Sequence, residues 1–132
     1  MWHHSIELEV RDYELDAQGI VNNSVYLNYC EHARHRAIGV LGLDFYTLHT
    51  EGWDPVVVRA ELDYKASLRS CDQFQVRTRI EPMGKLRFLF VQEIVRKDGT
   101  IAVEAKITAA TLKNGRPTPC PAILEAIKNL PE

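Results

Sequence analysis

A run of four segments in which apolar and polar side chains tend to alternate fills the second half of the chain. The segments are residues 55–66, 73–80, 86–95 and 101–109. A period of two places successive side chains on opposite faces of an extended strand, so each segment predicts a strand with one face toward a core. Met83-Gly84-Lys85 and Asp98-Gly99 separate the last three segments, and Asp-Gly is typical of a tight hairpin turn. The pattern therefore predicts consecutive antiparallel strands.

The first of these segments has a strict alternation that assigns its side chains to faces. The apolar side chains expected on one face are Val56, Val58, Ala60, Leu62, Tyr64 and Ala66. The charged side chains expected on the other face are Arg59, Glu61, Asp63 and Lys65. Such a division predicts a long strand with one face in contact with water.

The first half of the chain predicts one more strand and one long helix. Residues 6–10 alternate between aliphatic and charged side chains, which is typical of a half-buried strand. A helix over residues 23–41 is expected, because apolar residues recur there at helical spacing: Tyr26, Tyr29 or Cys30, Ala33, Ala37 and Leu41. Asn22 and Asn23 are suitable N-caps for it, and Gly39 and Gly42 suit its end. A short closing helix is expected near residues 122–130.

This order of elements predicts an α+β fold in which an antiparallel sheet of about five strands packs against one long helix. A chain of 132 residues has the usual size of one domain, so residues 1–132 are taken as a single domain. One helix cannot cover both faces of such a sheet, and its long edge strands lack partners. A homo-oligomer, either a dimer or a dimer of dimers, is therefore expected.

Composition narrows the class of partner. A net charge of -2 and a pI near 6.2 argue against binding to nucleic acid or to an anionic membrane surface. No apolar run of membrane length interrupts the sequence. Three cysteines without CxxC spacing, at positions 30, 71 and 120, are typical of free thiols in a reducing cytoplasm. Nucleotide-binding loops and nucleophilic serine elbows are absent from the sequence.

The segment from Arg11 to Arg34 carries the densest pattern of functional side chains. Its sequence is RDYELDAQGIVNNSVYLNYCEHAR. The order of residues in it is an Asp, two residues, a Gly, two aliphatic residues, a helix cap, Tyr-Leu and Glu-x-Ala-Arg. This order resembles the 4-hydroxybenzoyl-CoA thioesterase-like family of hot-dog proteins. The segment is also similar to plant acyl-lipid thioesterases and to bacterial long-chain acyl-CoA thioesterases. A weaker resemblance covers the rest of the chain.

This resemblance implies a hot-dog fold and hydrolysis of an acyl-CoA or acyl-carrier-protein thioester. It implies that Asp16 is the nucleophile or the general base and that the backbone N–H of Asn23 is the oxyanion donor. The physics agrees, because the N-terminus of a helix offers unpaired N–H groups and a positive dipole end to a developing negative charge. Gly19 would allow the backbone to approach the thioester. Family members often have His where this chain has Asn23, which leaves acid–base chemistry to Asp16.

Other residues are candidates for substrate binding. Tyr26 lies on the helix, and Arg69, Lys85 and Arg87, together with Lys65, are basic residues at strand ends. Such cations could meet the phosphates of CoA or of a phosphopantetheine arm. No cofactor is expected, because CoA or phosphopantetheine belongs to the substrate.

The predicted helix carries four further polar positions. Glu31 and Arg34, three residues apart, are expected to form an ion pair within the chain or between subunits, and Glu31 is a reserve catalytic carboxylate. His32 and His35 also share helical spacing, but with no third ligand nearby a metal site is not expected.

Two other functions compete with thioester hydrolysis. A hot-dog hydratase or dehydratase is expected to pair its acid with a histidine, and the matching position here is Asn23. A non-catalytic protein that senses acyl thioesters would normally include a DNA-binding helical module, for which this chain is too short. Hydrolysis assays on acyl-CoA and acyl-carrier-protein substrates separate the three.

Overall fold

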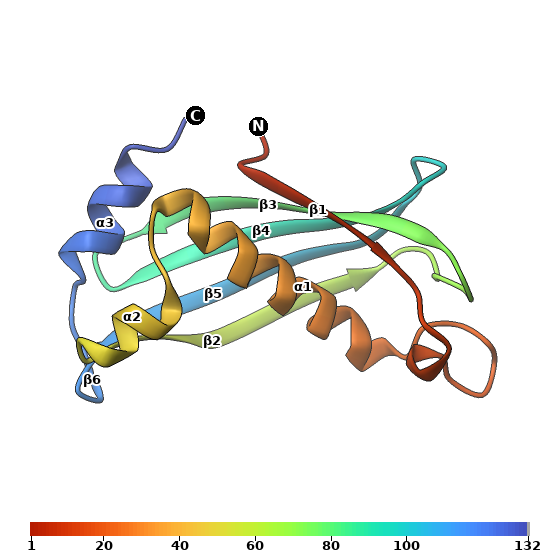
Figure 1. The fold of residues 1–132 in the computed structure, drawn as a ribbon, viewed down its shortest axis with the longest axis horizontal. Helices are drawn as coiled ribbons and strands as arrows, with labels where there is room; N and C mark the ends of the chain where they lie inside the picture. The colour runs from red at the N-terminus through yellow and green to blue at the C-terminus, as the bar shows by residue number, and fades with distance from the viewer. Residues whose placement is uncertain (132) are drawn as a thin grey trace.

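Five long strands pair into one curled antiparallel sheet in the order β1-β3-β4-β5-β2, and a short β6 pairs with β5 (Figure 1). The computed structural model describes residues 1–131. The strands are β1 (His4–Glu9), β2 (Trp53–Tyr64), β3 (Gln73–Met83), β4 (Arg87–Arg96), β5 (Ile101–Lys113) and β6 (Arg116–Pro117). The predicted α+β fold, with hairpins joining β3 to β4 and β4 to β5, is confirmed.

The long helix α1 (Asn23–Ala37) lies across the concave face of this sheet (Figure 1). Short elements complete the fold: the 3₁₀ turns Asp12–Glu14 and Ile38–Leu41, and the helices α2 (Phe45–Thr50) and α3 (Pro121–Lys128). In the part of the chain that the structure describes, no helix is long and apolar enough to span a membrane.

The helix packs closely because its buried side includes small residues. Ala33 and Ala37 are fully buried on α1, so the helix backbone comes near the sheet. Opposite them the concave face presents the alternate side chains of β3, β4 and β5: Phe74, Val76, Ile80, Phe88, Phe90, Ile94, Val103, Ala105, Ile107 and Ala109, all buried. The period of two expected for these strands is confirmed, and it places the core between the sheet and α1.

The long helix is shorter than expected, and the structure has one short helix that the sequence did not predict. The helix predicted to reach residue 41 ends at Ala37, and a 3₁₀ turn continues to Leu41 before Gly42 closes it with a φ of 71°. The sequence pattern missed α2, for which the Asp44 side chain caps the N-terminus by accepting from the Thr47 N–H at 3.2 Å. A helix of six residues is too short for periodicity to reveal.

The strand β2 departs from the strict alternation predicted for it. A β-bulge between Val57 and Arg59 shifts its register against β5. Val57 is paired with the inward-facing Ala109, whereas Ala60 is paired with the inward-facing Ile107. The concave face therefore continues through Val57, Ala60, Leu62 and Tyr64, and the assignment of Val56 and Val58 to that face is wrong because the bulge adds one residue to the strand.

Candidate active site

Asp16 lies at the tip of a tight hairpin that leads directly into α1. Leu15 bridges Val21, and the Asp16 N–H donates to the Ile20 carbonyl at 2.8 Å. The Asp16 carboxylate is half-buried, and its Oδ1 accepts from the backbone N–H groups of Gln18 at 2.8 Å and Ile20 at 3.3 Å. These two hydrogen bonds to Oδ1 fix the orientation of the Asp16 carboxylate on the hairpin.

Gly19 closes the turn of this hairpin. Its N–H donates to the Asp16 carbonyl at 3.1 Å, and its φ is 78°, a left-handed conformation that strongly favours glycine. No atom lies within 4 Å of the position that a Cβ would occupy. The structure therefore requires glycine here for the backbone conformation and not for lack of space.

The N-terminus of α1 directly follows the hairpin. Asn22 is the N-cap, and its side-chain oxygen accepts from the Ser24 N–H at 3.2 Å, while its carbonyl accepts from Val25 N–H at 2.9 Å. Among the described residues, the Asn23 N–H donates no hydrogen bond. Of the first three N–H groups of the helix, the one at Asn23 is thus available to an external oxygen.

A buried contact ties the base of the hairpin to the helix. The Tyr29 hydroxyl on α1 donates to the Glu14 Oε1 at 2.8 Å, and the same oxygen accepts from the Arg11 N–H at 2.8 Å. Burial and the adjacent carboxylate raise the pKa of Tyr29, so its hydroxyl remains a donor. The Glu14 carbonyl also accepts from the Asn22 N–H at 2.9 Å. Glu14 therefore connects both sides of the hairpin to α1, a role that its sequence pattern did not indicate.

Two further tyrosines surround the start of the helix. Tyr26 is buried, its hydroxyl accepts from the Leu68 N–H at 3.0 Å, and its ring packs edge-on against Tyr64. Tyr64, at the end of β2, donates to the Asn23 carbonyl at 3.2 Å and is about half exposed. Both side chains line a hollow of about 200 Å³ beside the hairpin. Tyr26 thus secures the loop before β3, and Tyr64, which sequence reasoning missed, is the more accessible of the two.

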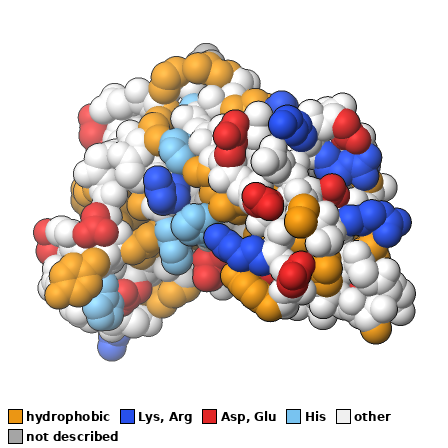
Figure 2. Space-filling view, turned by 45° about the vertical axis from the view of Figure 1, so that its right-hand side comes forward, with side chains coloured by type: hydrophobic (Ala, Val, Ile, Leu, Met, Phe, Trp, Pro, Cys, Tyr) orange, Lys and Arg blue, Asp and Glu red, His pale blue; other side chains and the backbone are white. Residues whose placement is uncertain are grey.

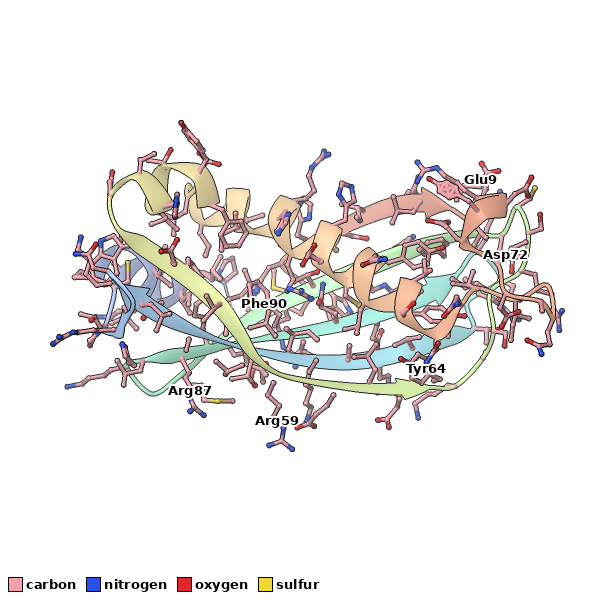
Figure 3. The ribbon with its side chains drawn as sticks, turned by 90° about the horizontal axis from the view of Figure 1, so that it is seen from below. Glu9, Arg59, Tyr64, Asp72, Arg87 and Phe90 are labelled. Atoms are coloured by element: carbon pink, nitrogen blue, oxygen red, sulfur yellow. The ribbon has the colours of Figure 1, made fainter. Side chains whose placement is uncertain are left out.

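The expected group of basic residues is divided between the two ends of the sheet. Ile20 of the hairpin bridges Arg69, so Arg69 lies beside the hairpin, across Ile20 from Asp16. Lys65 is nearby but pairs with Glu104 at 3.2 Å. Lys85 and Arg87 follow the far end of β3, which is roughly 35 Å long at about 3.4 Å per residue. Figure 3 shows Arg87 and Tyr64 at opposite ends of the molecule. Within one chain these cations therefore do not form one cluster, and the contact of each with a substrate phosphate stays a prediction.

Within one chain Glu31 and Arg34 do not form an ion pair, and a pair between subunits stays a prediction. Arg34 is buried and bonds to Gln92, whereas Glu31 is exposed, and their side chains are not within 4.0 Å of each other. Cys30 is fully buried beneath them. Burial raises the pKa of its thiol to about 11, which leaves it protonated and unreactive at neutral pH.

Comparison with known proteins identifies the family. The sequence profile of the thioesterase-like superfamily matches residues 10–128. The chain belongs to this superfamily. Its curled sheet and central helix match those of a DHNA-CoA thioesterase from Staphylococcus aureus, with a TM-score of 0.87 and 25% identity over 94% of this chain and 87% of that one. The predicted hot-dog fold is thereby confirmed.

Curated relatives extend the same similarity. A chloroplastic acyl-acyl carrier protein thioesterase of Arabidopsis thaliana is 40% identical over 90% of this chain and 64% of its own length. A putative esterase of Aquifex aeolicus is 31% identical over 91% of this chain and 94% of its own length. The chain thus spans somewhat less than two thirds of the plant relative.

Proposed function

We propose that this superfamily member hydrolyses an acyl thioester carried by CoA or by acyl carrier protein. One observation supports this most directly: the half-buried Asp16 carboxylate lies on the hairpin that ends at the unpaired Asn23 N–H of α1. A carboxylate and an N–H donor at a helix N-terminus are the two groups that thioester hydrolysis needs. The carboxylate either activates the water that attacks the carbonyl carbon or attacks this carbon itself, and the donor stabilises the oxyanion that forms.

Two routes use this arrangement. In the first, Asp16 removes a proton from water, the water oxygen bonds to the carbonyl carbon, and the C–S bond breaks, with the proton passing to the leaving thiolate. In the second, an Asp16 oxygen attacks the carbon and expels the thiolate, and water then hydrolyses the resulting anhydride. In both, Asn23 N–H stabilises the negative oxygen. Water completes the reaction, so neither route requires a cofactor or metal.

The hydratase alternative finds less support in this site. The hairpin and the first turn of α1 contain carboxylate, amide and hydroxyl groups but no histidine. We propose that the exposed Arg69 beside the hairpin contacts a substrate phosphate.

The deciding experiment incubates the purified protein with a panel of acyl-CoA thioesters and with the corresponding acyl carrier protein thioesters. Release of free thiol and free acid, in equal amounts, supports the proposal. Binding without release supports a sensor, and addition of water to an enoyl thioester without thiol release supports a hydratase.

We also propose that the protein forms a homodimer through the edge of β2. The outer edge of β2 pairs with no strand of the described chain, and three adjacent valines on it, Val56, Val57 and Val58, are between 36% and 51% exposed. A long apolar strand edge is a template for pairing with another strand. Antiparallel pairing with a second copy would satisfy this edge and bring two concave faces together.

All three cysteines are free thiols, and we propose a reducing compartment, the cytoplasm, as the location of this protein.

Replacing Val58 with Lys should convert this dimer to monomer at low micromolar concentration. A lysine on this edge in each copy would bring like charges into the proposed strand pair, and like charges placed across a strand pair destabilise it. Light scattering coupled to size exclusion measures the mass. Val40→Lys is the matched control, because Val40 is 42% exposed in the turn Ile38–Leu41, which packs against α1 and α3. A wild-type protein that is monomeric under these conditions contradicts the proposal.

A further inference from the structure

A hollow of about 200 Å³ adjoins the hairpin that carries Asp16. Its lining comes from the hairpin, from α1 and from the end of β2 with the residues that follow it: Ile20, Val21, Tyr26, Tyr64, Lys65, Ala66 and Ser67. Ile20 also donates its N–H to the Asp16 Oδ1 at 3.3 Å. Tyr64, which Figure 3 shows beside the first turn of α1, donates to the Asn23 carbonyl. Residues of the hollow thus contact both residues that the proposed reaction uses.

Tyr26 brings an unused hydrogen-bond donor to this hollow. The residue is buried, with 4% of its surface exposed, and its hydroxyl oxygen accepts from the Leu68 N–H at 3.0 Å. A phenol hydroxyl donates as well as accepts, yet within the part of the chain that the structure describes the Tyr26 proton is donated to no acceptor. Buried polar groups are normally hydrogen-bonded. The Tyr26 hydroxyl is therefore available to donate to an oxygen from outside the chain.

This hydroxyl remains protonated near the Asp16 carboxylate. Burial is the main cause that raises the pKa of Tyr26, and smaller effects of Tyr64 and of the Asp16 charge raise it further. The hydrogen bonds of Asp16 are with the Gln18 and Ile20 N–H groups, and neither joins it to Tyr26. Tyr26 is thus a neutral donor within reach of the Asp16 charge, and not a second base.

The other polar side chains of the hollow differ in what they leave free. Tyr64 gives its proton to the Asn23 carbonyl, and Lys65 pairs with Glu104 at 3.2 Å. The Ser67 hydroxyl forms no hydrogen bond with any described residue, although the Ser67 carbonyl does. The hollow therefore combines a free phenol donor, a free hydroxyl and aliphatic side chains. This set suits a secondary amide in a short aliphatic chain, because the amide oxygen accepts and the amide N–H donates.

Charges near the hollow are local. Figure 2 shows acidic and basic side chains interspersed on the face that it presents. The exposed Arg69 adjoins the hollow, because Ile20 of the lining bridges Arg69. An uncharged, amide-bearing chain that ends in a phosphate would therefore place its chain in the hollow and its phosphate near Arg69.

We propose that this hollow binds the arm that follows the sulfur of the thioester, and that Tyr26 is a specificity-determining residue that donates to the first amide carbonyl of this arm. CoA and acyl carrier protein share the arm, phosphopantetheine, in which an ethylene link joins the sulfur to a secondary amide. This amide lies close to the reacting carbon, as the hollow lies next to Asp16. The inference rests on the proposed thioesterase function and names the part of the substrate that is recognised there.

The test compares two thioesters of hexanoic acid. S-hexanoyl-N-acetylcysteamine has the amide at its natural place, and S-pentyl thiohexanoate has a plain chain of the same length instead. For each protein the kcat/KM of the amide thioester is divided by the kcat/KM of the pentyl thioester. Tyr26→Phe removes only the hydroxyl, and it should lower this ratio roughly 10-fold, because the complex with the amide thioester loses one hydrogen bond.

The ratio separates recognition from folding. Tyr26→Phe also deprives the Leu68 N–H of its acceptor, so the variant should melt at a lower temperature, but this defect affects both substrates alike. Ser67→Ala keeps Tyr26 and should lower the ratio in the same direction, because the amide N–H loses its acceptor. Tyr13→Phe is the matched control. It removes a hydroxyl from the 3₁₀ turn before the hairpin, where Tyr13 is 73% exposed, and it should leave the ratio at the wild-type value.

Binding is measured without turnover by calorimetric titration of Asp16→Asn protein, with and without Tyr26→Phe. The titrants are hexanoyl-CoA and hexanoyl-acyl carrier protein. Affinity should fall roughly 10-fold with both, or with the one carrier for which the hollow is built. If the wild type cuts no thioester but Tyr26→Phe weakens binding in this way, the hydrolytic function is wrong and the arm site stands.

Two results overturn the inference. One is a folded Tyr26→Phe protein that keeps the wild-type ratio and affinity. The other is an equal loss with both hexanoyl thioesters, which would show that Tyr26 acts on the reacting group or only secures the loop at Leu68. If Tyr26→Phe does not fold, an unchanged ratio in Ser67→Ala overturns the inference instead.

Discussion

Replacing Asp16 with Asn should lower thioester hydrolysis by on the order of 10²–10⁴-fold if the carboxylate is a general base, and by more if it is the nucleophile. The amide keeps an oxygen that can accept from the Gln18 and Ile20 N–H groups, so the hairpin and the helix N-terminus should stay in place. Thiol release under saturating substrate measures kcat, and circular dichroism melting checks the fold.

Asp12→Asn is the matched control for this prediction. Asp12 belongs to the same loop, is exposed, and accepts from the Ser70 hydroxyl at 3.3 Å, a bond that Asn can also accept. Its kcat should remain within a few-fold of wild type. An acyl-enzyme trapped on Asp16 and seen by mass spectrometry selects the nucleophilic route. Near wild-type hydrolysis by Asp16→Asn with a normal melting curve would show that Asp16 is not the catalytic carboxylate, and Glu31 would be tested next.

The second large effect is expected at Glu14, which does not touch the proposed reaction. Glu14→Ala removes the acceptor of the buried Tyr29 hydroxyl and of the Arg11 N–H. The hairpin that carries Asp16 then loses its tie to α1, and a misplacement of about 1 Å at a reacting group can reduce the rate roughly 10²-fold. Kinetics should show a fall in kcat with KM nearly unchanged. The free energy of unfolding should fall by about 2 kcal/mol, because a buried donor is left without its charged partner.

Two variants separate positioning from general destabilisation. Glu14→Gln retains an acceptor oxygen for both donors and should recover most of kcat. Tyr29→Phe removes the donor instead. It should lower kcat, as Glu14→Ala does, without leaving a buried hydroxyl unpaired. If Glu14→Ala loses stability but keeps wild-type kcat at a temperature well below its melting point, Glu14 stabilises the fold and does not position Asp16.

The sequence by itself determined the class of fold and the location of the chemical groups. A period of two in four consecutive segments and a helical period before them are local consequences of which side chains face the core, and the structure has the corresponding strands and helix. The cluster from Arg11 to Arg34 predicted a carboxylate just before a helix N-terminus. That relation depends on chain order alone, because residues so close in sequence cannot lie far apart.

Only the tertiary structure decided which distant residues meet. Arg69 lies beside the Asp16 hairpin whereas Lys85 and Arg87 lie at the far end of the sheet, because strand register, and not residue type, sets which strand ends adjoin. The sequence likewise did not reveal the bulge in β2, since one extra residue changes which side chains share a face without changing the composition of the strand. Arg34 was expected to pair with Glu31 three residues away. It turns inward to Gln92 of β4, because the rotation of α1 against the sheet, fixed by packing at Ala33 and Ala37, decides which side of a helix is buried.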